Sequence, residues 1–343
     1  MKRLEHPLPE PLLEVKDLKV HFPTEDGLVK AVDGVSLLVS PGETLGVVGE
    51  SGSGKSVTFL TVMGLVTKRE ARIQGQVLFR GDDLLKLPRE EMRNVRGAKI
   101  SMIFQDPLTA LNPVHRVGDQ IAEVFQIHRG TSKKEALEES VNLLQLVGIP
   151  RPRERARQYP HEFSGGMRQR AMIAMALALN PDLLIADEPT TALDVTVQAQ
   201  ILDLIDRLKE EFDAAVVMIT HDLGVVAEHC DDIMVMYAGR VVEMGERRDI
   251  YYGAHHPYTW GLLQSISRID QARTERLRPI KGQPPSLIRV PPGCPFHPRC
   301  PYVMDICKVE VPQLLPADGH HASACHLPIS EKKRIMSEEV LVR

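Results

Sequence analysis

The chain has 343 residues, which is enough for about two domains or for one large domain with an appendage. Hydrophobic residues make up 43% of it and charged residues 26%, which is ordinary for a globular protein. With 42 Lys+Arg against 46 Asp+Glu, the formal net charge is −4. No overall charge therefore draws the chain to nucleic acid or to an anionic membrane surface.

Neither a membrane-spanning helix nor a secretory signal is expected. The longest uninterrupted apolar run in the middle of the chain covers residues 171–179, whereas a spanning helix needs about 20 residues. Residues 1–7 contain no apolar core that could serve as a signal. We therefore expect the chain to work in the cytosol.

The first predicted strand, residues 44–48, leads directly into a glycine-rich segment. Residues 49–56 read Gly-Glu-Ser-Gly-Ser-Gly-Lys-Ser and fit the phosphate-loop pattern G-x-x-x-x-G-K-[ST]. Residues 57–63 can continue as a helix, so the strand–loop–helix context of the motif is present. Glycines let backbone amides surround phosphate oxygens, and the helix start adds partial positive charge. We expect Lys55 to reach the β- and γ-phosphates and Ser56 to bind Mg²⁺.

A helix is predicted next, over residues 132–147. Ser132 and Glu135 form a capping box, apolar residues follow at helical spacing, and Gly148 ends the helix. A second helix is expected to begin at Ser164, where Gly165 and Gly166 leave its first amides open. By itself this segment favours an ordinary cap behind a glycine hinge. The alternative is a second anion site that completes the nucleotide site of another subunit.

The apolar run 183–186 predicts a second buried strand, and it ends in Asp187 and Glu188. A charge at the end of a buried strand is costly unless it has a partner, and phosphate-bound Mg²⁺ is such a partner. We therefore assign Asp187 to the metal and Glu188 to a water molecule that attacks the γ-phosphate. An exposed acidic turn is the alternative.

Strands and helices alternate through the rest of this region. A helix with one apolar face is predicted around residues 197–212, and a third buried strand over residues 215–219. This alternation predicts an α/β fold with a mostly parallel sheet. Functional residues should then lie at the carboxyl ends of the strands.

The last 50 residues hold four of the five cysteines. Residues 284–301 are rich in proline, so we expect an ordered loop around the cysteines rather than a long helix or a central strand. The spacing lacks C-x₂-C, which disfavours a zinc ribbon, while two Cys-Pro steps are typical of iron–sulfur ligation. Four thiolates suit a [4Fe–4S] cluster or Zn²⁺, and unligated thiols are the third possibility. The candidate ligands are Cys294, Cys300, Cys307 and Cys325.

Six segments together resemble the nucleotide-binding domain of ABC transporters. The resemblance covers about residues 12–250 and implies a P-loop NTPase core of the ABC ATPase type. A helical subdomain would be inserted at about residues 106–163, and a loop-rich, cysteine-containing extension would follow at 251–343. The segments, in chain order, resemble the phosphate loop (49–56), the Q-loop (100–105), the signature motif (164–166), Walker B (184–188), the D-loop (191–194) and the switch histidine (220–222).

The resemblance also implies roles for individual residues. Glu188, His221 and Gln105 would be catalytic, and Ser56, Gln105 and Asp187 would hold Mg²⁺. Phe22 would stack on adenine, although family members more often have tyrosine there. The residues that would bind nucleotide are Phe22, Gly49, Glu50, Ser51, Gly52, Ser53, Gly54, Lys55, Ser56, Ser164, Gly165, Gly166 and Asp194.

The C-terminal region narrows the resemblance further. Residues 282–285 and 292–301 are similar to the extension of oligopeptide/dipeptide permease ATPases, in which such cysteines are associated with an iron–sulfur cluster. The resemblance implies a [4Fe–4S] cluster on the four cysteines, with Zn²⁺ as the alternative. Histidines close enough in sequence to replace a cysteine are His297, His320, His321 and His326.

The leading hypothesis is an ATP-hydrolysing subunit that energises peptide uptake from the cytoplasmic face of the membrane. It would pair with a similar but distinct ABC ATPase, dock on two transmembrane permease chains and receive substrate from an extracytoplasmic peptide-binding protein, with no nucleic acid as partner. The alternative is a soluble ABC ATPase acting on nucleic acid or the ribosome. Such proteins usually have two ABC units or a long coiled coil, and this chain has neither. A small-molecule kinase would have no use for the signature and D-loop motifs.

Overall fold

A computed structural model of the chain describes residues 10–191, 193–265, 280–318 and 320–340. The expectation about residues 1–7 lies outside this part, as does Ala192 of the segment that resembles a D-loop. Internal contacts divide the chain into two compact units. Unit 1 comprises Met1–Glu14, Leu38–Glu43 and Val77–Val217, and unit 2 comprises Val15–Leu37, Thr44–Gln76 and Met218–Arg343.

Unit 1 contains a pair of parallel strands, β6 (Ile100–Ile103) and β7 (Leu183–Asp187). Every residue of both strands is buried, which is why the sequence reads as continuous apolar runs rather than as an alternating pattern. The strand predicted at residues 183–186 is confirmed and extends by one residue. Its last residue, Asp187, is therefore part of the buried strand.

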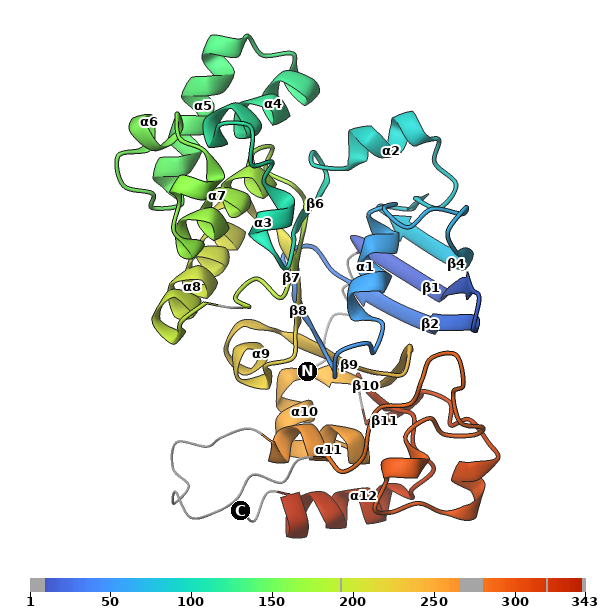
Figure 1. Cartoon of the computed structure of the whole chain (residues 1–343). Coiled ribbons are helices and arrows are strands. Elements are labelled where there is room, and N and C mark those ends of the chain that lie inside the picture. The colour runs from blue at the N-terminus through green and yellow to red at the C-terminus, as the bar shows by residue number, and fades with distance from the viewer. Residues whose placement is uncertain (1–9, 192, 266–279, 319, 341–343) are drawn as a thin grey trace, which may run out of the picture. The chain divides into compact units, whose positions relative to one another are not determined.

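The helices of unit 1 lie mostly between these two strands in sequence (Figure 1). The capping box of α5 is present: Ser132 Oγ accepts from the Glu135 amide at 3.4 Å, and Glu135 Oε2 accepts from the Ser132 amide at 3.2 Å. Helices α4, α5 and α7 pack against one another. The elements are α2 (Arg89–Val95), α3 (Pro107–Ala110), α4 (Val117–Arg129), α5 (Lys133–Leu146), α6 (Pro152–Arg155), the short 3₁₀ helix η1 (Pro160–Glu162), α7 (Gly165–Leu177) and α8 (Val195–Phe212), with the two-residue strand β5 (Asp82–Asp83).

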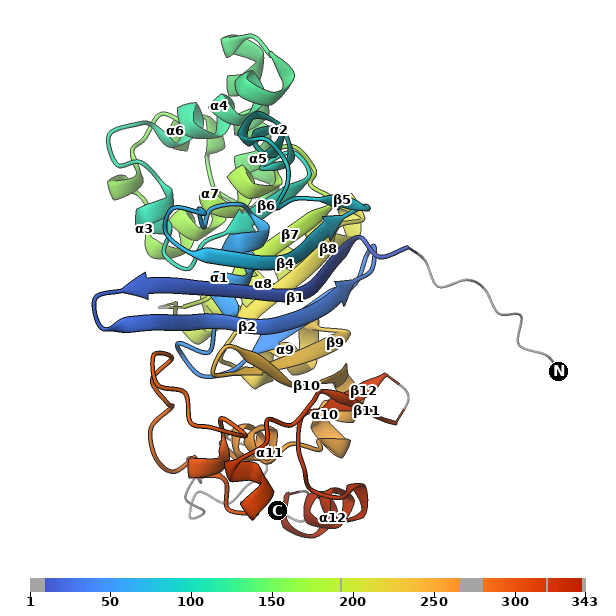
Figure 2. The ribbon, with the colours of Figure 1, turned by 90° about the vertical axis from the view of Figure 1, so that its right-hand side faces the viewer.

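Unit 2 has β9 (Asp232–Tyr237) between two partners, β3 (Thr44–Val48) in parallel and β10 (Arg240–Glu246) in antiparallel orientation. The C-terminal strand β12 (His321–Ser323) pairs with β10, and β11 (Leu315–Asp318) pairs with β12. The C-terminal region therefore adds two strands to the sheet that carries β3 (Figure 2).

Four strands of the described part of the chain have residues in both units. Two of them, β1 and β2, are neighbours in a second sheet and are seen side by side in Figure 2. The strand predicted at residues 215–219 is confirmed as β8 and extends by one residue. The four strands that cross are β1 (Leu13–Thr24), β2 (Gly27–Val39), β4 (Arg72–Phe79) and β8 (Ala215–Thr220).

The remaining elements of unit 2 are short. Residues 284–301 form the expected loop, interrupted only by the 3₁₀ helix η2 (His297–Arg299). Within the described ranges, no helix combines the length and the apolar character needed to cross a membrane. The elements are α1 (Lys55–Val62), α9 (Leu223–His229), α10 (Arg247–Gly253), α11 (Pro257–Gln264), η3 (Asp305–Lys308), α12 (Ile329–Ile335) and the π-helical turn η4 (Met336–Val340).

Candidate functional site

The phosphate loop follows β3 and leads into α1 within unit 2. Gly49 has a φ of 153° and Gly54 a φ of 101°, which residues with a side chain rarely adopt. A Cβ atom on Gly49 would lie 2.2 Å from the Met236 carbonyl oxygen, and one on Gly54 would lie 2.3 Å from that of Ala31. Both positions therefore require glycine, because a side chain at either would collide with these carbonyl groups.

Polar groups of the loop are arranged for an anion. The ammonium group of Lys55 is buried and donates to the carbonyl oxygens of Gly49 at 2.7 Å and Glu50 at 3.1 Å. The Ser53 hydroxyl is also buried, and no described residue bonds with it. A buried hydroxyl without a protein partner and a lysine folded over the loop fit a bound polyphosphate.

The two catalytic candidates of unit 1 meet directly. Gln105 follows β6 and Glu188 follows β7, and these strands are parallel neighbours, so their carboxyl ends lie together. Gln105 Nε2 donates to Glu188 Oε2 at 2.9 Å, and Thr191 Oγ1 donates to the same oxygen at 2.8 Å. The carboxylate of Glu188 is thus oriented by two donors, of which Gln105 is also a predicted site residue.

The turn after β7 is constrained as well. Glu188 has a φ of 46°, a left-handed conformation that is uncommon for a residue with a side chain. The Gln169 side chain donates to the carbonyl oxygen of Pro189, the residue after Glu188, at 2.6 Å and so restrains the backbone of the turn. Asp187 is 6% exposed at the end of its strand, where a buried carboxylate is suited to a cation.

The segment 164–166 forms the start of α7. Ser164 is the N-cap, and its hydroxyl accepts from the Met167 amide at 3.3 Å, as the sequence predicts. Asp194 caps α8 in the same way, accepting from the Val197 amide at 3.0 Å. Ser164, Gly165 and Asp194 are all exposed, so this helix terminus of unit 1 is open to a second molecule.

Two further candidates lie in unit 2. His221 is exposed and directly follows β8, next to Asp222, which caps α9 by accepting from the Gly224 amide at 2.7 Å. Phe22 lies on β1 and is partly buried. The predicted nucleotide-site residues therefore fall into two groups: the phosphate loop, Phe22 and His221 lie in unit 2, and the remaining ones lie in unit 1.

Known proteins share both regions of the chain. A family model described as "ABC transporter" matches residues 32–191, and one described as "Oligopeptide/dipeptide transporter, C-terminal region" matches residues 242–307. The oligopeptide transport ATP-binding protein OppD of Salmonella typhimurium is 55% identical over 93% of this chain and 95% of its own length. The chain belongs to the oligopeptide/dipeptide transport ATP-binding proteins.

A further relative and a solved structure support the same family and fold. The dipeptide transport ATP-binding protein DppD of Bacillus subtilis is 54% identical over 91% of this chain and 93% of its own length. A dimeric structure of the ATP-binding cassette MJ0796, in a post-hydrolysis state with ADP and Pi, matches with a TM-score of 0.62 and 28% identity over 69% of this chain and 99% of that chain. The predicted α/β fold of an ABC ATPase and the ATPase activity are thereby confirmed.

In this oligopeptide/dipeptide transport ATP-binding protein, the C-terminal region contacts the phosphate loop, which the sequence did not predict. The guanidinium group of Arg299 forms two hydrogen bonds to the Glu50 carboxylate, Nη1 to Oε2 at 2.5 Å and Nη2 to Oε1 at 2.9 Å. The Glu50 amide donates to the Tyr258 hydroxyl at 2.8 Å. Partners that lie more than 200 positions apart leave no local signal in a sequence.

The four C-terminal cysteines surround one cavity. Cys294, Cys300, Cys307 and Cys325 all line it, together with His297 and His326. In the described part of the chain, no three of the four sulfurs lie within 4.8 Å of one another. His321, another candidate ligand, is instead hydrogen-bonded to a carboxylate in a separate cluster.

Backbone amides donate to three of these sulfurs. Cys294 accepts from Phe296, Cys300 from Tyr302 and Cys325 from Leu327, in each case two residues farther along the chain. Burial raises the pKa of Cys294 to about 11 and that of Cys300 to about 12, so these thiols are neutral at pH 7 unless a cation compensates a thiolate. Buried sulfurs that already accept hydrogen bonds fit metal-bound thiolates.

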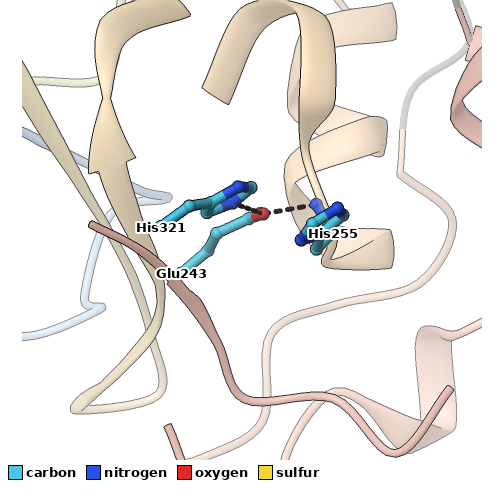
Figure 3. Close-up of side chains that lie close together, drawn as sticks. All are labelled: Glu243, His255 and His321. Atoms are coloured by element: carbon cyan, nitrogen blue, oxygen red, sulfur yellow. Dashed lines mark hydrogen bonds and ion pairs between the residues drawn. The ribbon is translucent and has the colours of Figure 1, made fainter. Parts of the chain in front are cut away.

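A buried cluster of Glu243, His255 and His321 joins three elements (Figure 3). Glu243 Oε1 is hydrogen-bonded to His321 Nε2 at 2.8 Å and to the His255 amide. The two imidazole rings are stacked, with centroids 4.4 Å apart and planes 7° from parallel. Imidazole lone pairs lie in the ring plane, so two parallel rings cannot direct them at one ion. We therefore interpret the cluster as a hydrogen-bonded joint between β10, the start of α11 and β12.

Proposed function

We propose that this chain hydrolyses ATP to energise the uptake of di- and oligopeptides, as a peripheral subunit on the cytoplasmic face of the membrane. The contact between Gln105 and Glu188, beside the buried Asp187, carries the hydrolytic part of this proposal. The assignment of peptides as the transported substrate is supported by the relatives, which are named oligopeptide and dipeptide transport ATP-binding proteins, and by the matching C-terminal region.

Individual residues would share the work of hydrolysis. The phosphate loop, residues 49–56, would bind the polyphosphate through its amides and through the Lys55 ammonium group. Oxygen atoms suit Mg²⁺, and Ser56, Asp187 and Gln105 would provide them. When bound, Mg²⁺ would supply positive charge that neutralises the charge developing on the phosphates.

The remaining roles concern water and the γ-phosphate. The Glu188 carboxylate, held by Gln105 and Thr191, would accept a proton from the attacking water. His221 would contact the γ-phosphate, and Phe22 would pack against the adenine. We assign residues 12–250 to the nucleotide-binding domain, 106–163 to the helical subdomain that meets the permease, and 251–343 to the C-terminal extension.

We infer that a second, similar ABC ATPase completes each nucleotide site. Ser164, Gly165 and Gly166 would contact the γ-phosphate held by the partner, and Asp194 would lie in the interface. The exposure of this helix start supports the inference, because its amides are available to an anion of another subunit. Val195, the first residue of α8, is 84% exposed and would be covered in such an interface.

Substituting Gly165 tests the shared site. A Cβ atom on Gly165 would have no neighbour nearer than 3.8 Å, so a side chain fits, and an acidic residue is favourable at a helix start. We expect Gly165→Glu to keep the melting temperature of the isolated chain but to lower ATP turnover of the assembled transporter at least about tenfold, since its charge would repel the partner's γ-phosphate. Gly165→Ala is the matched control and should retain most of the activity. Equal activity of both variants would contradict the shared site.

We further propose that Cys294, Cys300, Cys307 and Cys325 hold a [4Fe–4S] cluster. A tetrahedral Zn²⁺ site would bring the sulfurs to about 3.8 Å from one another, given Zn–S bonds of about 2.3 Å. The wider arrangement of the sulfurs around the cavity supports the larger cluster over zinc. Three amide-to-sulfur hydrogen bonds support thiolate ligands in either case.

Replacing one ligand tests this site. The chain purified without oxygen is expected to contain about four iron atoms and to absorb broadly in the visible range. Cys300→Ser should lose most of the iron and the absorbance, because a serine hydroxyl is a poor ligand for this cluster. Cys230→Ser is the matched control, since Cys230 is buried elsewhere, beside Gly46 of β3. Zinc in place of iron, or iron retained by Cys300→Ser, would contradict the cluster.

Co-purification distinguishes a transport ATPase from one that acts on nucleic acid. A tag on this chain should isolate two membrane proteins and a second ABC ATPase from detergent-solubilised membranes, and nuclease treatment should not change their yield. Recovery of ribosomal or DNA-bound material that nuclease removes would contradict the transport function.

A further inference from the structure

Glu50 places a negative charge inside a loop whose task is to bind an anion. Its carboxylate belongs to the phosphate loop, one residue after Gly49 and five before Lys55. An uncompensated carboxylate at this position would repel a polyphosphate and oppose the favourable charge of Lys55. The side chain is only partly exposed, so water screens its charge incompletely.

Arg299 provides the compensating charge. Its guanidinium group binds both carboxylate oxygens of Glu50, and its side chain is 4% exposed. Two parallel hydrogen bonds fix the carboxylate in orientation as well as neutralising it. The charged partner raises the pKa of Arg299 further above its ordinary value, so the group is cationic at all relevant pH values.

Several contacts within unit 2 hold the guanidinium group in place. Its Nε donates to the Lys281 carbonyl oxygen at 3.1 Å. Its central carbon lies 5.8 Å from the centroid of the Tyr237 ring and 6.0 Å from that of Phe296, within reach of a cation–π interaction. The Phe296 ring in turn packs edge-on against Tyr237. Groups other than Glu50 therefore help to fix the position of the guanidinium group.

The same short segment belongs to the cysteine site. Arg299 ends the 3₁₀ helix η2 and is followed immediately by Cys300. Phe296 follows Cys294 by two residues, and its amide donates to the Cys294 sulfur. The segment from Cys294 to Cys300 thus carries two of the four sulfurs at its ends and the arginine that binds the phosphate loop between them.

We propose that Arg299 is a positioning residue for the phosphate loop, and that the four-cysteine site acts on nucleotide affinity through the Arg299–Glu50 pair. The first part rests on the contacts alone. The second part rests on the [4Fe–4S] cluster proposed above. An intact cysteine site holds residues 294–300 in the conformation that keeps Glu50 neutralised, and loss of the site releases the arginine and lowers ATP affinity.

The first part is tested by titration calorimetry of ATP binding to the full chain. Arg299→Met should raise the Kd for ATP about tenfold, because Glu50 keeps its charge without a partner. Arg299→Lys should recover part of the affinity, since it restores the charge without the two parallel bonds. The matched control is Arg334→Met, which removes an arginine of α12 that pairs with Glu331 of the same helix and Glu338 of η4, and it should leave the Kd unchanged.

A double-mutant cycle separates this role from a general loss of structure. Measured in the Glu50→Gln background, Arg299→Met should change the Kd at most about twofold, because no carboxylate remains to be neutralised. The tenfold effect in the presence of Glu50 should also shrink as salt rises from about 0.05 M to about 0.5 M. A tenfold loss that persists in the Glu50→Gln background, or a Kd for Arg299→Met within twofold of wild type, would overturn the role of Arg299.

The second part is tested with Cys300→Ser, measured for iron and for ATP affinity. We expect iron loss together with a several-fold rise in Kd, and we expect no further rise when Cys300→Ser is added to Arg299→Met. Iron loss with an unchanged Kd would overturn the coupling and leave the cluster standing. Retained iron would overturn the cluster, and the coupling with it, whatever the Kd.

Discussion

Replacing Glu188 by glutamine is expected to lower ATP turnover by a factor of about 10² to 10⁴, the usual contribution of a general base. The change removes proton acceptance but retains the size of the side chain. ATP affinity should be unchanged, because in the proposed arrangement Glu188 contacts the attacking water rather than the phosphates. Phosphate release by the assembled transporter gives the turnover, and calorimetry of the full chain gives the affinity.

The control for this variant is Glu210→Gln, which neutralises an exposed carboxylate on α8 and should leave turnover unchanged. Thr191→Val adds a structural check, since it removes one of the two hydrogen bonds to Glu188 Oε2 while keeping the carboxylate. Its effect should be smaller than that of Glu188→Gln. If Glu188→Gln kept the wild-type turnover, a group other than Glu188 would have to accept the proton of the attacking water.

Replacing Lys55 by methionine should raise the Kd for ATP about 100-fold and abolish measurable hydrolysis. Methionine keeps the buried aliphatic stem but removes the ammonium group, which now bonds to the carbonyl oxygens of Gly49 and Glu50. The loss corresponds to one or two charge-assisted hydrogen bonds to phosphate oxygens. The measurement is ATP titration of the full chain by calorimetry.

Lys86→Met is the matched control for the lysine variant. Lys86 is exposed and pairs with Asp83 outside the phosphate loop, so its replacement should leave ATP affinity as it is. The thermal midpoint of both variants should be recorded, because a folded Lys55→Met protein is needed for the comparison. An ATP Kd within a few-fold of wild type would contradict the role given to Lys55.

Local features of the fold were predictable from the sequence. The strand at residues 44–48, the capping box of Ser132 and Glu135, and the N-cap at Ser164 all appear as expected. Each depends on residues only a few positions apart, for which period and side-chain chemistry carry the information. Gln105 and Glu188 were each expected in the nucleotide site, but their contact was not predicted, because no strand was expected at residues 100–103.

Contacts between distant segments were not predictable. Arg299 and Glu50 are 249 positions apart, and neither residue type distinguishes this pair from a surface charge. The addition of β11 and β12 beside β10 was missed for the same reason, since short strands at a sheet edge have weak patterns. The stacked pair His255 and His321 belongs to the same class of long-range contacts.

The most direct test of the whole account is ATP-driven uptake of a labelled oligopeptide into vesicles. The vesicles would contain the transporter isolated through a tag on this chain, with the peptide-binding protein outside and ATP inside. We expect uptake with the wild-type chain and at most about one hundredth of that rate with Glu188→Gln present in equal amount. Equal uptake by the two preparations, or uptake that does not require ATP, would contradict the proposal that this chain powers peptide import.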